Sequence, residues 1–194
     1  FVPHLLVQGS HETGKSRLLN TLKNVSYRCV HNADLTSAYI YRGINSHNLT
    51  MYISEYHRLN EEEQQSVDSV INAGQKRGET IGRASEQASG GYGIESFDPF
   101  SHVAVSTQYE PDDDLISRCF RITTKPAQRS IPRQLDDRPD LRKQLLYLRF
   151  RYLRSGKIEA AENAAVESMN EMGVRNRLSE KLWCILTVGE LADK

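Results

Sequence analysis

A glycine-containing segment between an apolar run and a helical pattern constrains this chain more than any other feature. The apolar run covers 4–8 and ends at Gly9, and a run this short favours a buried parallel strand over a helix. From Lys15 onward apolar residues recur at helical spacing, at Leu18, Leu19, Leu22 and Val25. A strand, a tight loop and a helix therefore follow one another directly, as they do at the start of a βα unit.

The loop between them has the residue pattern that binds phosphate groups. Gly9 and Gly14 permit tight turns, so that successive backbone N–H groups at a helix N-terminus can surround an anion. We expect Lys15 to reach the β- and γ-phosphates of ATP, and the Ser16 hydroxyl to ligate the Mg²⁺ that bridges them. The predicted nucleotide-binding residues are Gly9, Ser10, His11, Glu12, Thr13, Gly14, Lys15, Ser16 and Arg17. The alternative is a glycine-rich helix entry with an exposed lysine, which does not explain why every fixed position of the pattern is filled.

The following part of the chain alternates between strand and helix patterns. Strands are expected at 26–30, 49–53, 102–107 and 120–123, and helices at 34–41 and 61–73. Gly74 is placed to end the helix expected at 61–73. The glycine-rich stretch 78–97 predicts a mobile loop or a loose hairpin. This alternation predicts an α/β fold with a central parallel sheet flanked by helices.

A proline-containing stretch separates this part from a helical end. The prolines of the expected linker are Pro126, Pro132 and Pro139. Helices are expected beyond it at 140–154, 159–172 and 179–191. In the first of them the residues expected to face inward are Leu141, Leu145 and Leu148. We therefore predict a P-loop nucleotide-binding α/β core at 1–125, and a linker with a small C-terminal α-helical lid at 126–194.

Composition narrows the class of protein and its partners. The 194 residues include 25 Lys and Arg against 25 Asp and Glu, so the formal net charge is zero and no global field attracts nucleic acid. The 38% of apolar residues and 26% of charged residues are typical of a soluble globular protein, and no segment predicts a membrane span. Three widely spaced cysteines, Cys29, Cys119 and Cys184, predict reduced thiols in a cytoplasmic protein. A first residue other than Met predicts an excised or processed domain.

An acidic residue directly after the strand expected at 49–53 is the candidate catalytic base. In most ATPases with such a loop a second strand ends in Asp-Glu, where the Asp holds the metal's water shell and the Glu activates the attacking water. Here the strand ends in Ser54-Glu55. We expect Glu55 to be the general base, and Ser54 to support the Mg²⁺ only weakly through a neutral hydroxyl, so that hydrolysis is slow. The alternative is that Glu55 is an ordinary solvent-facing residue at a strand end.

The residues around this strand end resemble a known family. Segment 52–59, Tyr-Ile-Ser-Glu-Tyr-His-Arg-Leu, resembles the Asp-Glu-Ala-Asp-Arg-Leu segment of AAA+-type ATPases. Segment 71–78, Ile-Asn-Ala-Gly-Gln-Lys-Arg-Gly, closely resembles a Leu-Asn-Ala-Gly-Tyr-Arg-Arg-Gly segment of an uncharacterised ATPase family found in plasmid, phage and mobile-element replication proteins. Segments 102–107, 116–119 and 177–186 extend the resemblance over nearly the whole chain. It implies an AAA+-like core and lid.

The resemblance also implies arginines that act on the nucleotide. Segment 115–120 resembles the Leu-Leu-Ser-Arg-Phe segment of minichromosome maintenance helicases, which makes Arg118 the candidate finger that reaches a neighbouring subunit's nucleotide. Arg177, or Arg175 near it, resembles the lid arginine that contacts the γ-phosphate. Each of these arginines has an alternative role as an ordinary surface residue.

A polar sensor is implied in the same way. Segment 105–108 is similar to the strand end at which AAA+ proteins place a residue that orients the lytic water. Gln108 or Thr107 is the candidate here, although the usual residue is Asn, which leaves the choice between them open.

Two segments are candidates for contact with DNA. Around the glycine-rich stretch, Arg77, Arg83 and Tyr92 could touch a nucleic-acid backbone or stack on a base, and a plain loop is an equal alternative. The second segment is basic and helical, with Arg142, Lys143, Arg149, Arg151, Arg154 and Lys157. Such a run is more typical of a solvated helix face than of a DNA site.

These features lead to two hypotheses from different classes. The first is an ATPase motor that forms a homo-oligomeric ring, such as a hexamer, and acts on single-stranded or duplex DNA as a helicase or replication module of a mobile element. The second is a nucleotide-dependent switch or scaffold with weak or no hydrolysis, because Ser54 stands in place of the usual Asp. A GTPase is disfavoured because segment 124–127, Thr-Lys-Pro-Ala, lacks the Asp that would read a guanine, and no acceptor site for a small-molecule kinase is evident.

Overall fold

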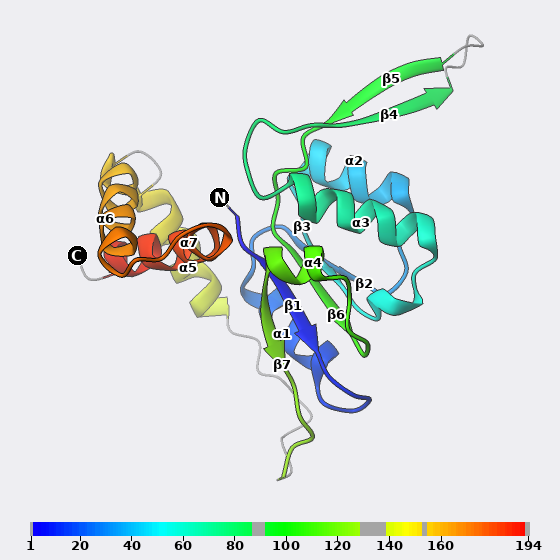
Figure 1. The fold of residues 1–194 in the computed structure, drawn as a ribbon, viewed down its shortest axis with the longest axis horizontal. Coiled ribbons are helices and arrows are strands. Elements are labelled where there is room, and N and C mark those ends of the chain that lie inside the picture. The colour runs from blue at the N-terminus through cyan, green and yellow to red at the C-terminus, as the bar shows by residue number, and fades with distance from the viewer. Residues whose placement is uncertain (1, 87–91, 129–138, 153–154, 193–194) are drawn as a thin grey trace.

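Five parallel strands form the central sheet of the protein. The structure, a computed structural model, describes residues 2–86, 92–128, 139–152 and 155–192 (Figure 1). In spatial order the strands are β2 (Cys29–Asn32), β3 (Thr50–Ile53), β6 (Val103–Thr107), β1 (His4–Gln8) and β7 (Cys119–Thr123). Every neighbouring pair is parallel. The predicted α/β fold with a central parallel sheet is confirmed.

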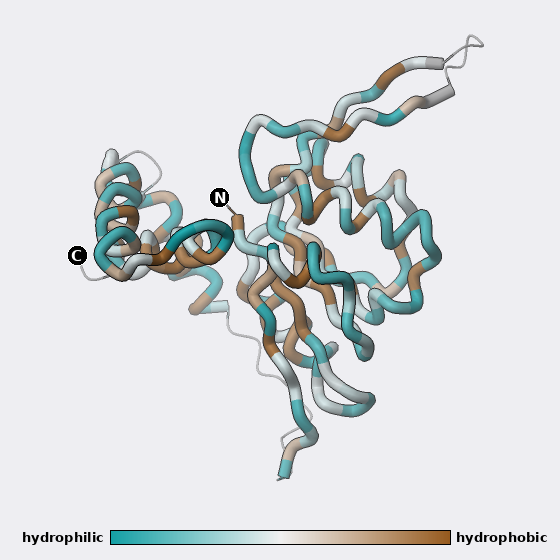
Figure 2. Tube along the Cα trace, viewed as in Figure 1, coloured by the Kyte–Doolittle hydropathy of each residue, from teal (hydrophilic) through white to brown (hydrophobic). Residues whose placement is uncertain are grey.

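Helices cover both faces of this sheet. On one face α1 (Lys15–Val25) packs Leu19 against Val7, Tyr52 and Ala104. The other face carries α2 (Ser37–His47), α3 (Glu61–Ala73) and α4 (Asp113–Arg118), whose apolar residues form one cluster with Leu6 of β1. Figure 2 shows the resulting concentration of hydrophobic residues along the central strands. Because successive residues of a strand point to opposite faces, Leu6 and Val7 anchor β1 in both layers.

The first part of α3 and its end are defined by local signals. The Asn60 side chain accepts the N–H of Glu63 at 2.9 Å, and the Glu63 carboxylate accepts the N–H of Asn60 at 3.1 Å, which closes a capping box. At the other end, a Cβ on Gly74 would lie 2.4 Å from the carbonyl oxygen of Val70 and 2.6 Å from that of Pro99. The bounds predicted for this helix, 61–73, are confirmed.

Several other elements differ from the prediction. The strand expected at 26–30 begins later, at Cys29, because Ser26 instead ends α1 through hydrogen bonds of its N–H and hydroxyl to the carbonyl of Leu22. The helix expected at 34–41 begins at Ser37, since Thr36 caps it, and continues to His47. The short helix α4 was not predicted at all. A short 3₁₀ helix, η1 (Tyr56–Arg58), follows β3.

A separate two-stranded antiparallel hairpin occupies the glycine-rich stretch. It consists of β4 (Ile81–Glu86) and β5 (Tyr92–Phe97), and it projects away from the sheet beside α2 and α3 (Figure 1). At its base, Phe97 packs against Tyr41 with ring centroids 5.6 Å apart, and the Arg83 guanidinium lies over the Tyr41 ring at 4.7 Å. Of the two alternatives expected for 78–97, the hairpin is therefore the one observed. Gly90 and Gly91 lie outside the described residues.

Three helices follow the core: α5 (Pro139–Tyr152), α6 (Lys157–Glu171) and α7 (Arg177–Ala192). The pair α6 and α7 buries Ala161, Ala165 and Met169. Ion pairs and hydrogen bonds tie α7 to the core: Arg177 to Asp114 at 3.0 Å, Lys76 to Glu180 at 2.8 Å, and Lys181 to the carbonyl of Ile116 at 3.3 Å. The predicted linker proline Pro132 and the basic residue Arg154 lie outside the described residues.

The expectation that α5 turns its leucines inward is wrong. Leu141, Leu145 and Leu148 are 37%, 42% and 42% exposed, and no residue described in this helix is buried. The physical reason is that α5 meets the end of α1 across a groove, where Leu145 and Leu146 face Val25 and Tyr27, and no described residue of α5 becomes buried there. Although α5 exposes apolar side chains, no helix among the described residues is long and apolar enough to cross a membrane.

A pair of histidines, His4 at the start of β1 and His102 directly before β6, lies in the core. His4 is fully buried, its Nδ1 accepts the N–H of Val103 at 3.2 Å, and its ring stacks on His102 with centroids 6.4 Å apart. Burial lowers the pKa of His4 to about 3, and the charges of His102 and Arg118 act in the same direction. Burial also lowers the pKa of His102. Both imidazoles are therefore neutral in the folded protein at neutral pH.

We predict that the free energy of unfolding falls as the pH is lowered below about 6.5, because the unfolded chain then binds protons at His4 and the folded chain does not. Each buried neutral histidine contributes up to about 1.4 kcal/mol per pH unit between its unfolded and folded pKa values. Urea unfolding at about pH 7, 6 and 5 measures this slope. His4→Asn, which keeps a side-chain acceptor for the Val103 N–H, should reduce the slope. A slope equal to that of the parent would assign the effect to other groups.

Candidate functional site

The carboxyl ends of the parallel strands meet at one edge of the sheet, which we call the carboxyl edge. From this edge the chain leaves β1 toward α1 on one face, and leaves β6 toward α4 on the other. Connections that leave two neighbouring strands toward opposite faces open a crevice between them, and ligands of open α/β sheets bind in this crevice. The structure brings the loop that begins at Gly9, the pair Ser54 and Glu55, and Gln108 to this edge.

The loop after β1 is held by hydrogen bonds to the strands on either side. The N–H of Gly9 donates to the carbonyl of Thr107 at 3.3 Å, and the Thr13 hydroxyl lies 2.7 Å from that of Thr124. A Cβ on Gly9 would lie 2.3 Å from Oγ1 of Thr124 and 2.7 Å from Oγ1 of Thr13. Only glycine therefore fits at this position without displacing its neighbours.

The loop passes into α1 through left-handed backbone. Glu12 has a φ of 60° and Gly14 a φ of 86°, and Gly14 is the N-cap residue of α1. No side chain caps this helix and its first turn holds no acidic residue, whereas Thr36 caps α2 and Asn60 caps α3. Among the described residues, no cap side chain thus accepts from the N-terminal N–H groups of α1, which carry the positive end of the helix dipole.

Lys15 is buried, with 5% of its surface exposed, and its Nζ donates to the carbonyl of Ser10 at 2.8 Å. Its side chain therefore folds back across the loop. The other predicted loop residues differ in exposure: Ser10, His11, Glu12 and Ser16 are exposed, and Arg17 is half-buried on the first turn of α1. A buried cation is thus held beside exposed hydroxyl groups at one helix terminus.

Ser54 lies at the end of β3 in a chain of hydrogen bonds. Its Oγ is 2.5 Å from Nε2 of His31 on β2, and Nδ1 of His31 is 2.7 Å from Oδ1 of Asn20 on α1. Ser54 itself is buried, with 6% of its surface exposed. Burial lowers the pKa of His31, and the charge of Lys23 lowers it further, so the imidazole is neutral at neutral pH.

Glu55 has a strained backbone conformation. Its φ of 57° and ψ of 41° lie in the left-handed region, which non-glycine residues seldom adopt. Its N–H donates to the Ser106 hydroxyl at 3.3 Å, and its carboxylate lies 3.5 Å from Nε2 of His57 and 3.4 Å from Nε of Arg58. The carboxylate is three-quarters buried at the carboxyl edge, and strain of this kind gathers at functional sites.

The two candidate sensor residues follow each other at the end of β6. The Thr107 hydroxyl is engaged in its own turn, since it bonds to both the N–H and the carbonyl of Tyr109 at 3.2 Å. Gln108 is half-exposed at the same edge. Of the two, Gln108 is therefore the side chain that can turn toward a ligand.

The structure does not bring the candidate arginines to the loop of the same chain. Arg118 directly precedes β7, and Cys119 of β7 pairs with His4 at the start of β1. Arg118 thus lies at the opposite edge of the sheet, roughly 16 Å from the carboxyl edge at about 3.3 Å per residue. There it donates to the carbonyl of Asn72 at 3.0 Å and pairs with Asp114 at 3.6 Å. Arg177, at the start of α7, bonds to Asp114 and Ser117 of α4.

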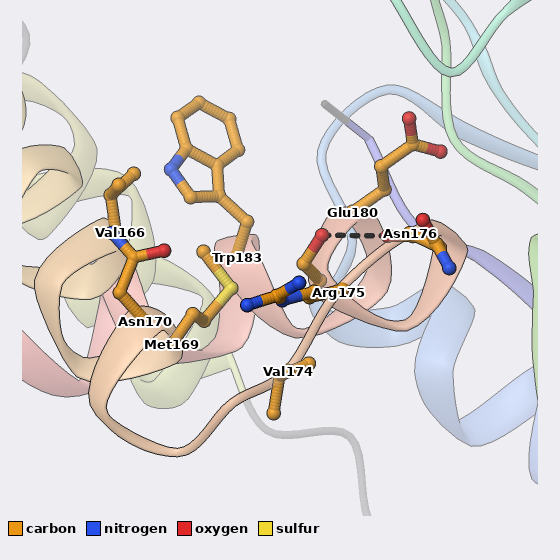
Figure 3. A pocket seen from close by; sticks show the side chains of 9 residues that line it. Val166, Met169, Asn170, Val174, Arg175, Asn176, Glu180 and Trp183 are labelled. Atoms are coloured by element: carbon orange, nitrogen blue, oxygen red, sulfur yellow. Dashed lines mark hydrogen bonds between the residues drawn. The ribbon is translucent and has the colours of Figure 1, made fainter.

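The third candidate arginine, Arg175, lines a groove within the C-terminal helices. This groove, of about 580 Å³, is formed by α6, α7 and the segment that joins them, and Figure 3 shows Arg175 beside Met169 and below Trp183. It is lined by residues of the predicted lid only. A smaller hollow of about 210 Å³ lies at the carboxyl edge, where His57 packs edge-on against Tyr109.

Several residues at this edge were not predicted. They are Thr124, which braces Gly9 and Thr13, and the pair of His31 and Asn20, which contacts Ser54. His31 would have been placed at the carboxyl edge had the strand been assigned to 29–32, because it then lies one residue before the strand's end. Asn20 and Thr124 have no sequence signal, since their roles depend on long-range packing.

No protein-family model matches this sequence, and no curated protein matches it significantly. Function is therefore inferred from the residues of the carboxyl edge.

We predict that Gly9→Ala destabilises the fold by roughly 1–3 kcal/mol, because the added Cβ must displace Thr124 and Thr13. Gly82→Ala is the matched control, since a Cβ there meets nothing within 4 Å. Urea unfolding of both variants measures the difference. Equal stability of the two would show that the loop relaxes freely around position 9.

Proposed function

We propose that this protein is an ATPase of the P-loop class that binds ATP with Mg²⁺. One observation carries the proposal: a loop with left-handed turns leads from the buried strand β1 into the uncapped N-terminus of α1, and the buried Lys15 folds across it. Uncapped N–H groups, a helix dipole and a lysine together form an anion site. Their pattern of spacing is that of a triphosphate loop.

The residues present fit Mg·ATP in two respects. Gly9 and Gly14 leave the backbone open at positions where a side chain would clash or be strained, so a phosphate can approach the N–H groups closely. Ser16 places an exposed hydroxyl at the first turn of α1, and hydroxyl oxygens suit Mg²⁺. Among the described residues no group of three or more His, Cys, Asp or Glu could hold a metal ion, so phosphate and water oxygens would complete its shell.

In this proposal each part of the loop has a distinct task. Bound Mg·ATP supplies the phosphoanhydride bond and a metal that polarises the γ-phosphate. Lys15 leaves the Ser10 carbonyl and neutralises the β- and γ-phosphates, while the N–H groups of the loop orient them. Ser16 and Ser54 hold the metal and its water shell. Nucleotide binding then needs little rearrangement of the backbone, because the loop is already braced by Thr124 and Thr107.

Glu55 is the proposed general base. Its carboxylate is three-quarters buried at the carboxyl edge beside His57 and Arg58, and its N–H donates to the Ser106 hydroxyl. A base in such a place can take the proton from a water that attacks the γ-phosphate. Gln108, one strand away, would orient that water.

The AAA+-like arrangement with a helical lid, the homo-oligomeric ring and the role of Arg118 belong to the same proposal. Arg118 lies at the edge of the sheet remote from its own loop, which suits action on a neighbouring subunit and not on its own nucleotide. To act there it would have to release the carbonyl of Asn72 and Asp114. An assembly of at least two subunits, such as the proposed ring, is thus required for Arg118 to take part in hydrolysis.

A second candidate function is a nucleotide-dependent switch. It is favoured by the neutral Ser54, which is held by neutral His31 where a motor ATPase would place a carboxylate. The motor hypothesis draws support from the projecting hairpin, whose base carries Arg83, because a cation there can contact a DNA phosphate. Multiple-turnover hydrolysis measured with and without single-stranded DNA separates the two. Stimulation by DNA supports the motor, and binding without turnover supports the switch.

We predict that Lys15→Ala weakens ATP binding by roughly 100-fold or more, because it removes the cation aimed at the β- and γ-phosphates. Calorimetric titration of ATP with Mg²⁺ measures the affinity. Lys157→Ala, an exposed lysine at the start of α6, is the control and should bind as the parent does. Unchanged affinity in Lys15→Ala would refute the phosphate-loop assignment.

We predict that Glu55→Gln keeps the affinity for ATP within about twofold but lowers turnover by roughly 100-fold or more, since the amide preserves shape and removes the base. Glu61→Gln, in the exposed first turn of α3, serves as the control. Steady-state phosphate release measures turnover. Turnover of Glu55→Gln within a factor of two of the parent would place the base elsewhere.

A further inference from the structure

Three elements of the core join their polar side chains behind Ser54. Asn20 lies on α1, His31 on β2 and Ser54 at the end of β3, and the distances along this chain are 2.7 Å and 2.5 Å. Tyr52 and Ser54 are two residues apart along β3, so both side chains point to the α1 face of the sheet. The Tyr52 hydroxyl lies 2.7 Å from that of Ser26 at the end of α1. Ser54 is thus fixed by side chains of the α1 face, in a chain of hydrogen bonds that ends at the exposed Asn20.

The direction of the hydrogen bonds follows from the groups involved. The amide oxygen of Asn20 can only accept, so Nδ1 of His31 carries the proton and donates to it. In the neutral imidazole Nε2 is then an acceptor, and the Ser54 hydroxyl must donate to it. The proton of Ser54 therefore points into the protein, and the lone pairs of its oxygen point away from His31.

We propose that His31 is a positioning residue, which holds Ser54 so that its oxygen accepts a hydrogen bond from a water of the Mg²⁺ shell. The proposal rests on the proposed function, since it concerns the metal that accompanies ATP. A free serine hydroxyl rotates about its C–O bond and can turn its proton toward that water. The protons of the metal-bound water would then repel the hydroxyl proton. With its proton given to Nε2, Ser54 presents only lone pairs, and polarisation along the chain makes its oxygen a stronger acceptor.

In this arrangement the neutral pair of His31 and Ser54 would hold the water shell of the metal in part as a carboxylate does. A hydrogen-bonded partner behind a metal-site residue fixes the orientation of that residue and raises its basicity, and removing such a partner typically costs 10- to 100-fold in metal affinity. Asn20 is exposed on α1 and fixes the tautomer from the far side of the ring. The three residues therefore act as one unit at the metal.

The test separates metal-dependent binding from binding of the nucleotide alone. A non-hydrolysable ATP analogue is titrated by calorimetry into the parent, His31→Phe and Ser54→Ala, with Mg²⁺ and with a chelator. We expect His31→Phe to lose about tenfold or more of the increase in affinity that Mg²⁺ gives, with chelator affinity within about twofold of the parent. Ser54→Ala should lose as much, and the double variant no more than either single one. His47→Phe, an exposed histidine on α2, is the control.

A second readout needs no nucleotide. Long-range ¹H–¹⁵N spectra of the parent should show His31 as the Nδ1–H tautomer, and Asn20→Ala should shift the tautomer balance without unfolding the protein. If His31→Phe misfolds, Asn20→Ala takes its place in the titration, with a smaller loss expected. An Nε2–H tautomer, or a Mg²⁺ effect unchanged in folded His31→Phe, overturns the inference and leaves the ATPase proposal standing. No binding of the analogue by the parent overturns both.

Discussion

β1 is hydrogen-bonded to β6 on one side and to β7 on the other, and this double pairing fixes the geometry of the carboxyl edge. With Leu6 and Val7 buried on opposite faces, the strand can neither shift its register nor tilt without exposing one of them. Its end therefore delivers Gly9 to a fixed point between Thr107 and Thr124, where only a glycine has room. The loop is held in place before any ligand arrives, which reduces the ordering that binding would require.

Elements with strong local signals were predicted closely from the sequence. The capping box of Asn60 and Glu63 and the glycine after it define α3, and the run of leucines after Lys15 defines α1. The second strand was misplaced because its start depends on where α1 ends, and Ser26 ends α1 by bonding to Leu22 and to Tyr52, which is distant in sequence. That error also hid His31, because its place at the end of a strand became visible only with the correct bounds.

The C-terminal helices show a different limit of sequence reasoning. Apolar residues occur on every side of α5, so their spacing selects no single inward face, and the fold leaves them exposed. The contacts of Arg118 in the core and of Arg177 in α7 could not be predicted from the sequence either. Asp114 draws Arg118 and Arg177 to one end of α4, and a pairing between residues 63 positions apart leaves no trace in local pattern. Resemblance to a motif suggested a role for these arginines, whereas the structure shows that both are engaged at α4, away from the loop after β1.

The neutral character of Ser54 and His31 also bears on how the site holds Lys15. A carboxylate at position 54 would lie at the same edge as the lysine and could compete with phosphate for it, since opposite charges attract strongly where water is scarce. In this structure the lysine instead donates to the Ser10 carbonyl, a bond to a neutral group that a triphosphate can replace without breaking an ion pair. If the proposed Mg²⁺ binds here, a serine in place of a carboxylate at position 54 also leaves one negative charge fewer beside it. Under the proposed function, the site therefore favours capture of the phosphates over tight retention of Mg²⁺, and the His31 hydrogen bond recovers part of what the metal loses. Under this proposal, such a site would bind nucleotide readily and turn it over slowly, which is the behaviour that a switch requires and that a motor would have to overcome through its neighbours.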